Sequence, residues 1–191
     1  MQRFDLAAIP PTPWKNGGGA TRELACWPPG ADMERFDWRV SVATIAQAGP
    51  FSAFAGVDRQ IMLLDGDGVH LRAPDGGVDH ALDQRWQPFA FSGDVALDCA
   101  LLGSTSQDFN LMLRRGRWQG EVQVVGAART PGSAPAGLCM VLAGRWERGG
   151  EVFTPGQGLW WSSAAPGAAL SPVAGGADVP VLAWVALSAK I

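Results

Sequence analysis

Gln60-Ile61-Met62-Leu63-Leu64-Asp65-Gly66-Asp67-Gly68, followed directly by Val69-His70-Leu71-Arg72, is the stretch that best defines the fold of this chain. An apolar run enters a turn that contains two glycines, and a second apolar run leaves it. This pattern predicts a β-hairpin, because glycine readily adopts the positive φ angles that tight hairpin turns require. We therefore expect strands at residues 60–64 and 69–72.

The same layout occurs again in the second half of the chain. In chain order, the matched segments are 60–66 with 137–144, 88–92 with 158–162, and 95–102 with 179–187. Because all the matches run in the same order, they indicate a duplicated β unit of about 90 residues.

The rest of the chain favours strands over helices. Its 25 glycines and 14 prolines are spread throughout, and no long segment combines a 3.6-residue period with a helix cap. Further strands are expected at 21–27, 36–45, 78–82, 86–91 and 109–113. The sequence thus predicts an all-β bicupin, with two cupin-like barrels or jelly-roll sandwiches. We expect residues 1–118 to form the N-terminal barrel and residues 119–191 the C-terminal one.

The composition excludes several classes of protein. The chain contains no run of 18 or more apolar residues, so the sequence predicts no membrane-spanning helix. The first six residues lack the long apolar run of a signal peptide. A formal net charge of −3 gives no electrostatic footprint for nucleic acid. We expect a cytoplasmic protein that binds neither nucleic acid nor membrane.

The histidines argue against the metal site that cupins usually carry. Such a site would need a His-x-His pair, a glutamate and a distant histidine, and the chain contains only His70 and His80. A mixed site with Asp67 or Asp79 is the alternative. We expect two surface histidines, no metal and no cofactor.

Trp14-Lys15-Asn16-Gly17-Gly18-Gly19-Ala20-Thr21-Arg22-Glu23 is the densest group of polar side chains beside a permissive backbone. Each glycine costs roughly 0.5–1 kcal/mol relative to alanine inside a regular element. Either the run forms a tight turn and bulge before the first long strand, or its backbone passes close to a ligand. In the second case Lys15, Asn16 and Arg22 would be its polar contacts. The two explanations are compatible.

Two strands carry polar pairs on one face. Arg39 and Ser41 share a face by two-residue alternation, opposite an apolar face, and Asp108 and Asn110 do the same. We expect only one face of the first strand to lie in a packed core. Either these pairs lie on exposed strand faces, or they point into a barrel and bind an anion there.

These residues also carry a resemblance to the HutD/Ves family. The segments that resemble it are 4–6, 13–23, 36–41, 49–52, 56–59, 64–68 and 108–112. The resemblance implies a bacterial cytoplasmic bicupin without the usual metal set. It also implies a link to histidine utilisation, with an intermediate such as N-formylglutamate or urocanate as ligand.

The leading hypothesis is a metal-free bicupin that binds a small carboxylate metabolite in its N-terminal barrel and has a regulatory role. Its expected ligand-binding residues fall into three roles. They are Lys15 and Arg39 for carboxylates, Asn16, Ser41 and Asn110 for hydrogen bonds to a formyl or amide group, and Trp14 or Phe51 for the pocket wall. Arg22 and Asp108 are further expected ligand-binding residues.

Two other functions stay open. A cofactor-free isomerase or hydrolase could use Lys15, Glu23, Asp58 and Asp108 as acid–base groups. A protein-interaction module could use apolar surface from the tryptophan-rich second half, and the sequence also allows a homodimer.

Overall fold

The computed structural model describes residues 1–163, 167–175 and 178–190, and it confirms the all-β prediction. The chain divides into two compact units, Pro10–Trp118 and Met1–Ile9 with Gln119–Ile191, which we call the N-terminal and C-terminal units. No helix among the described residues is long and apolar enough to cross a membrane.

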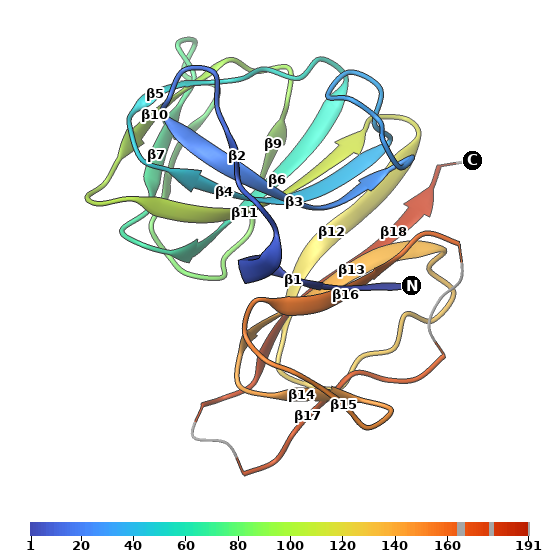
Figure 1. Cartoon of the computed structure of the whole chain (residues 1–191). Coiled ribbons are helices and arrows are strands. Elements are labelled where there is room, and N and C mark those ends of the chain that lie inside the picture. The colour runs from blue at the N-terminus through green and yellow to red at the C-terminus, as the bar shows by residue number, and fades with distance from the viewer. Residues whose placement is uncertain (164–166, 176–177, 191) are drawn as a thin grey trace. The chain divides into compact units, whose positions relative to one another are not determined.

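The N-terminal unit consists of two β-sheets (Figure 1). A six-stranded sheet has the order β2-β3-β4-β11-β6-β9, and a four-stranded sheet has the order β5-β10-β7-β8. The strands are β2 (Thr12–Pro13), β3 (Gly19–Trp27), β4 (Trp38–Ile45), β5 (Gly49–Phe51), β6 (Val57–Asp65), β7 (Val69–Arg72), β8 (Asp79–Leu82), β9 (Phe89–Ser92), β10 (Leu97–Leu101) and β11 (Ser106–Arg114).

The core of this unit lies between the two sheets. Ile61 and Leu63 from β6 pack with Val69 and Leu71 from β7 and with Leu97 from β10. The hairpin predicted from the Asp65–Gly68 turn therefore bridges the two sheets, since β6 belongs to one and β7 to the other. Apolar residues at every second position of β6 explain this inward face.

The C-terminal unit repeats the arrangement with fewer strands. Its five-stranded sheet has the order β1-β16-β13-β18-β12, and its three-stranded sheet has the order β15-β14-β17. The strands are β1 (Gln2–Asp5), β12 (Trp118–Val125), β13 (Ala136–Ala143), β14 (Trp146–Arg148), β15 (Glu151–Phe153), β16 (Gln157–Trp161), β17 (Ser171–Pro172) and β18 (Val181–Ala189), and a 3-10 helix η1 (Leu6–Ala8) follows β1.

Tryptophans fill the C-terminal unit. Trp146, Trp161 and Trp184 are buried in one cluster, and Trp161 packs against Trp184 with ring centroids 5.5 Å apart. A void beside Trp161 and Trp184 has a volume of about 10 Å³. That is about the room of one water molecule, so the interior is a packed core. These three side chains do not supply the apolar surface considered for a protein-interaction module.

The strand orders correct one of the three repeat matches. The order β4-β11-β6-β9 in the N-terminal unit corresponds to β12-β18-β13-β16 in the C-terminal unit. The matches of β6 with β13 and of β9 with β16 fit this correspondence. The counterpart of β18 is β11, however, and not the segment 95–102. The strand that occupies the position of β10 is β17, whose two residues carry no readable apolar pattern.

The domain boundaries also need a correction. The division between residues 118 and 119 coincides with the expected one, but residues 1–9 belong to the C-terminal unit. β1 pairs with β16, and Phe4 is buried there against Gly158, whose missing Cβ would lie 2.6 Å from the Phe4 ring. A four-residue strand that completes a distant sheet edge leaves no local sequence signal.

Candidate functional site

Buried polar side chains lie on the inward face of the six-stranded sheet. In register, Arg39 of β4 is opposite Met112 of β11, and Met112 is opposite Arg59 of β6. Residues paired in this way point to the same face. Ile61 on β6 shares the face and packs into the core between the sheets, so the arginines point inward as well.

The next two rows of this face carry the other polar groups. Ser41 is opposite Asn110, and Ala43 is opposite Asp108. The three polar side chains are almost completely buried. The face opposite them on β4, with Val40 and Val42, is buried too. The expectation that only one face of this strand is packed was therefore wrong, because the strand is central and covered on both sides.

Arg59 is the most unusual residue of this face. Its side chain is 7% exposed, and its guanidinium lies 5.0–5.3 Å from the ring centroids of Phe51, Phe54 and Phe91. One terminal nitrogen donates to Asn110 Oδ1 at 3.2 Å, the other donates to the Ser52 carbonyl at 3.3 Å, and buried Nε has no partner. No carboxylate of the described residues lies within 4.0 Å of this guanidinium.

The electrostatics of Arg59 follow from this setting. Burial, and then the nearby charge of Arg39, lower the pKa of Arg59 to about 10. The residue is therefore still a cation at neutral pH, held between three aromatic rings without a counter-ion. A buried cation with a free donor favours an anion beside it.

Arg39 is the second cation of the face. Its Nε donates to Glu23 Oε2 at 2.7 Å, and one terminal nitrogen donates to Ser41 Oγ at 3.3 Å. Glu23, on β3, lies opposite Ser41 of β4, and Cys26 lies opposite Arg39. A register shift between Glu23 and Ala25 puts both β3 residues on the inward face of the sheet. We call Glu23, Arg39, Ser41, Arg59 and Asn110 the arginine site.

Asp108 lies one row beyond the arginine site. Its Oδ1 accepts a hydrogen bond from Ser106 Oγ at 3.1 Å, while buried Oδ2 has no partner. Burial raises the pKa of Asp108 to about 7, and the Ser106 hydrogen bond opposes this only in part. Near neutral pH the carboxyl is thus about half protonated.

The Trp14–Glu23 stretch forms a tight turn between β2 and β3. Asn16 Oδ1 accepts from the Gly18 amide at 3.0 Å, and the Gly18 carbonyl accepts from the amides of Ala46 and Gln47. Lys15 and Asn16 are exposed in this turn. This is the first of the two explanations considered for the glycine run.

The turn does not meet the arginine site. Gly19 pairs with Ile45, six residues along β4 from Arg39, a separation of roughly 20 Å. The sequence had led us to expect Lys15 and Asn16 beside Arg39, and they do not lie there. Arg22 pairs with Val42 and so lies on the opposite face of the sheet. Trp14 packs against the core, with its Nε1 donating to Thr21 Oγ1 at 2.8 Å.

The glycines of this turn differ in what they tolerate. A Cβ on Gly19 would lie 2.2 Å from the Thr44 carbonyl oxygen, whereas Gly17 has a φ of +72° and open space around it. We expect Gly19→Ala to lower the free energy of unfolding by about 2 kcal/mol, through overpacking. Gly17→Ala should cost about 1 kcal/mol, through the left-handed backbone alone. Urea unfolding of both variants measures the difference, and equal costs would contradict the steric explanation.

The two histidines lie on the β7–β8 hairpin. His70 Nε2 is 2.5 Å from Asp79 Oδ1, and His80 stacks on Phe89 with centroids 3.7 Å apart. Asp67 instead accepts hydrogen bonds from Ser104. Among residues 1–163, 167–175 and 178–190, no group of three or more His, Cys, Asp and Glu side chains is placed to hold a metal ion.

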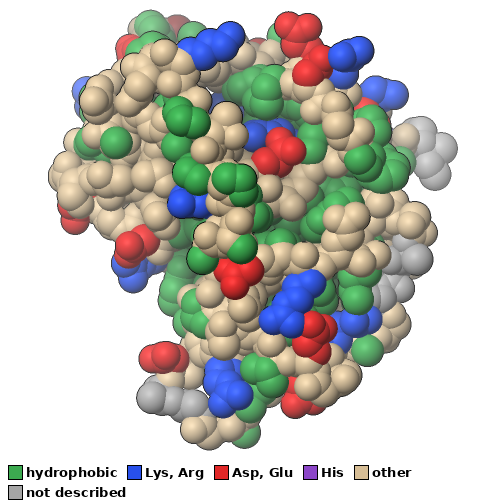
Figure 2. Space-filling view, viewed as in Figure 1, with side chains coloured by type: hydrophobic (Ala, Val, Ile, Leu, Met, Phe, Trp, Pro, Cys, Tyr) green, Lys and Arg blue, Asp and Glu red, His purple; other side chains and the backbone are tan. Residues whose placement is uncertain are grey.

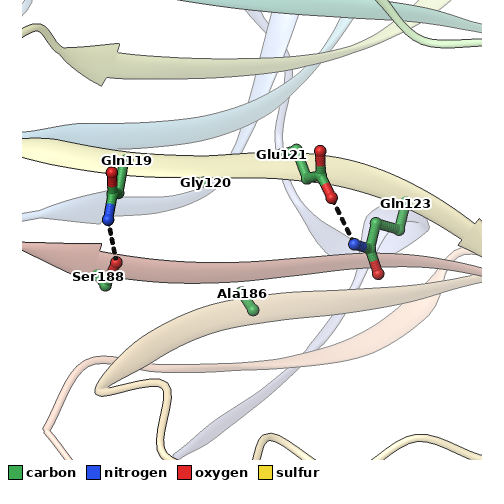
Figure 3. Close-up of a pocket in the computed structure, with 6 residues that line it drawn as sticks. All are labelled: Gln119, Gly120, Glu121, Gln123, Ala186 and Ser188. Atoms are coloured by element: carbon green, nitrogen blue, oxygen red, sulfur yellow. Dashed lines mark hydrogen bonds between the residues drawn. The ribbon is translucent and has the colours of Figure 1, made fainter.

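A shallow depression of about 430 Å³ lies in the C-terminal unit, on β12 and β18 (Figure 3). Its polar side chains bind one another: Gln119 Nε2 donates to Ser188 Oγ at 3.2 Å, and Gln123 Nε2 donates to Glu121 Oε1 at 2.5 Å. None of the residues that line the depression has a buried unpaired polar atom, and none of them is a cation. The arginine site is therefore the stronger candidate.

Two of the four candidate acid–base groups, Lys15 and Asp58, lie away from the inward face that Glu23 and Asp108 share. Lys15 lies in the exposed turn, and Asp58 is paired with Arg115 at 2.7 Å. Asp58 directly precedes Arg59 on β6, so its side chain points to the opposite face, away from the core.

Charged side chains of both signs are interspersed over the visible surface, without one large basic patch (Figure 2).

Comparison with known proteins identifies relatives of this chain. A model of the HutD family matches residues 6–178. Protein Ves of Cronobacter sakazakii is 41% identical over 166 residues, which are 86% of this chain and 89% of that protein. The chain belongs to the HutD/Ves family. Protein Ves of Citrobacter koseri is similarly close, with 40% identity over 84% of this chain and 83% of its own.

Solved structures agree with the fold of this HutD/Ves protein. HutD from Pseudomonas fluorescens SBW25, in a structure described as a formate condition, is 28% identical with a TM-score of 0.83 and covers 99% of this chain and 98% of its own. Ylba from Escherichia coli has a TM-score of 0.72 over 97% of this chain and 90% of its own, at 10% identity, and so supports the fold alone. The bicupin prediction is confirmed.

Sequence reasoning missed the central residue of the site in this HutD/Ves protein. The first strand of the hairpin was expected to begin at residue 60, but β6 begins at Val57. With that start, Arg59 falls between Val57 and Ile61 on the buried face of alternating positions. A lone arginine in an apolar period-two row was therefore the available signal.

Proposed function

We propose that this HutD/Ves protein binds a small carboxylate metabolite at the arginine site and, through that ligand, regulates histidine utilisation in the cytoplasm. The observation that carries the proposal is Arg59, a cation that is 7% exposed, has an unpaired Nε and lacks a carboxylate partner. A ligand carboxylate would supply the missing counter-ion and accept from Nε.

The surrounding groups suit such a ligand. Arg39 adds a second positive charge on the same inward face, and Ser41 and Asn110 offer a hydroxyl and an amide. Phe51 lies against Arg59 and would wall the site, as expected from the sequence. Lys15 and Asn16 lie in the exposed turn and Arg22 lies on the opposite face of the sheet, so these three residues are not part of the proposed site.

The ligand class is tested by thermal unfolding of the full chain with formate, N-formylglutamate, urocanate and glutamate. A ligand at 100 times its dissociation constant adds about 2.7 kcal/mol of stability. For a protein of this size we expect a rise in Tm of roughly 5–10 °C. Chloride and acetamide, at equal concentration, control for ionic strength and for neutral hydrogen-bonding solutes. No shift with any of the four compounds at millimolar concentration would contradict the proposal.

A further inference from the structure

The two arginines of the site differ in what already occupies them. Arg59 has no carboxylate partner, whereas Arg39 holds Glu23 through Nε at 2.7 Å. In the same pair, the Arg39 side chain is 11% exposed and the Glu23 side chain is 48% exposed. The arginine is therefore fixed in the barrel, while the glutamate reaches it from the rim.

We propose that Glu23 is an internal counter-anion that a second ligand carboxylate displaces from Arg39, so that Glu23 sets the selectivity between mono- and dicarboxylates. This inference rests on the proposed function of the arginine site. A monocarboxylate pairs with Arg59 and leaves Glu23 in place. A dicarboxylate pairs with both arginines, and its second carboxylate takes the position of the Glu23 carboxylate.

The geometry of Arg39 supports displacement over simple addition. A bidentate pair with a carboxylate often uses Nε and one terminal nitrogen. Glu23 already occupies Nε, and Ser41 accepts from a terminal nitrogen. A ligand carboxylate reaches Nε only when Glu23 leaves. Because the Glu23 side chain is half exposed, its carboxylate regains water when it moves away, at small cost.

The charge balance supports the same conclusion. With Glu23 in place, the arginine site has two cations and one anion, which suits one ligand carboxylate. When Glu23 turns away, both cations are uncompensated, which suits two ligand carboxylates. Arg39 and Arg59 are separated by one intervening strand, or roughly 10 Å between their backbones, and both side chains point to the same interior.

The test uses glutarate and formate as probes and isothermal titration calorimetry on the full chain. We expect Glu23→Gln to bind glutarate at least 10-fold more tightly than the wild type does, and formate within threefold. Glutamine keeps a carbonyl acceptor for Arg39 but removes the charge. The matched control is Glu151→Gln, because Glu151 is also paired with an arginine and its side chain is 46% exposed, in the C-terminal unit. That variant should bind both probes as the wild type does.

A double variant separates displacement from a general effect of charge. In an Arg39→Met background, Glu23→Gln should give no gain in glutarate affinity, because the competition at Arg39 has been removed. A gain that persists there, an equal gain for formate, or an unchanged or weaker glutarate affinity in Glu23→Gln alone would each overturn the inference. A urea midpoint for each variant establishes that it is folded.

The two levels of the hypothesis fail in different ways. If both probes bind the wild type, are lost in Arg59→Met and are unaffected by Glu23→Gln, then only the role of Glu23 is wrong. If the probes bind neither the wild type nor Glu23→Gln, the proposed carboxylate site itself is wrong, and the inference falls with it.

Discussion

Arg59→Met should weaken carboxylate binding by about 100-fold, or roughly 3 kcal/mol, while leaving the protein folded. The loss is large because Arg59 supplies both the buried charge and the unpaired Nε donor of the site. Methionine has a similar length, so it fills the space among Phe51, Phe54 and Phe91 without a cavity. The measurement is calorimetric titration with whichever compound gives the largest thermal shift.

The stability of this variant should change little. Removing the guanidinium relieves its desolvation, while Asn110 Oδ1 and the Ser52 carbonyl each lose a donor. These effects oppose each other, and we expect a net change within about 1 kcal/mol. The control is Arg85→Met, which removes an exposed arginine paired with Asp65 in the same unit. Equal affinities of Arg59→Met and the control would remove Arg59 from the site.

Asp108→Asn should change how stability depends on pH, by up to about 4 kcal/mol between pH 4 and pH 8. The pKa of Asp108 rises from 3.8 to about 7 on folding, because of burial. Between these values the folded protein holds a proton that the unfolded chain has released. The contribution of Asp108 is therefore most favourable below about pH 4, declines as the pH rises, and levels off above about pH 7.

Asparagine cannot ionise, so it lacks this decline. It keeps an acceptor for Ser106 but adds an amide that needs partners of its own, which costs a pH-independent amount. Relative to the wild type, the variant should therefore gain stability as the pH rises from 4 to about 7, and the difference should level off above that. Urea unfolding of both proteins at each pH measures this difference, in which the other carboxyl groups cancel. A difference that is constant with pH would show that folding does not raise the pKa of Asp108.

Local pattern was sufficient for most of the strands, because each apolar run ends in a glycine or proline turn. It failed where pairing is distant or the strand is very short. β1 completes a sheet edge formed some 150 residues later, and β17 has only two residues. Such strands form because they pair with a neighbouring strand, and their own residues show no strand pattern. A single sequence therefore does not reveal them.

For the site, alternation predicted that Arg39 and Ser41 share one face, and Asp108 and Asn110 another. It could not tell that the two strands are neighbours with their polar faces in register, which is a property of strand order. Lys15 and Asn16 are close to Glu23 in sequence, but their turn precedes β3. That end of β3 pairs with the end of β4 that is distant from Arg39. The same reasoning overlooked Arg59 because its strand was expected to begin one residue after it.

The pairing of β1 with β16 has a consequence for the order in which the molecule assembles. During synthesis, residues 1–9 emerge before residues 10–118, yet their partner strand emerges only after the N-terminal unit is complete. Domains generally fold as they leave the ribosome, so the continuous segment 10–118 can fold while residues 1–9 are still without their partner strand. The C-terminal unit is thus discontinuous in the gene. We expect a fragment that begins at residue 119 to lack an edge strand, and the segment 10–118 to be the only one of the two units that can be cut out as one continuous piece.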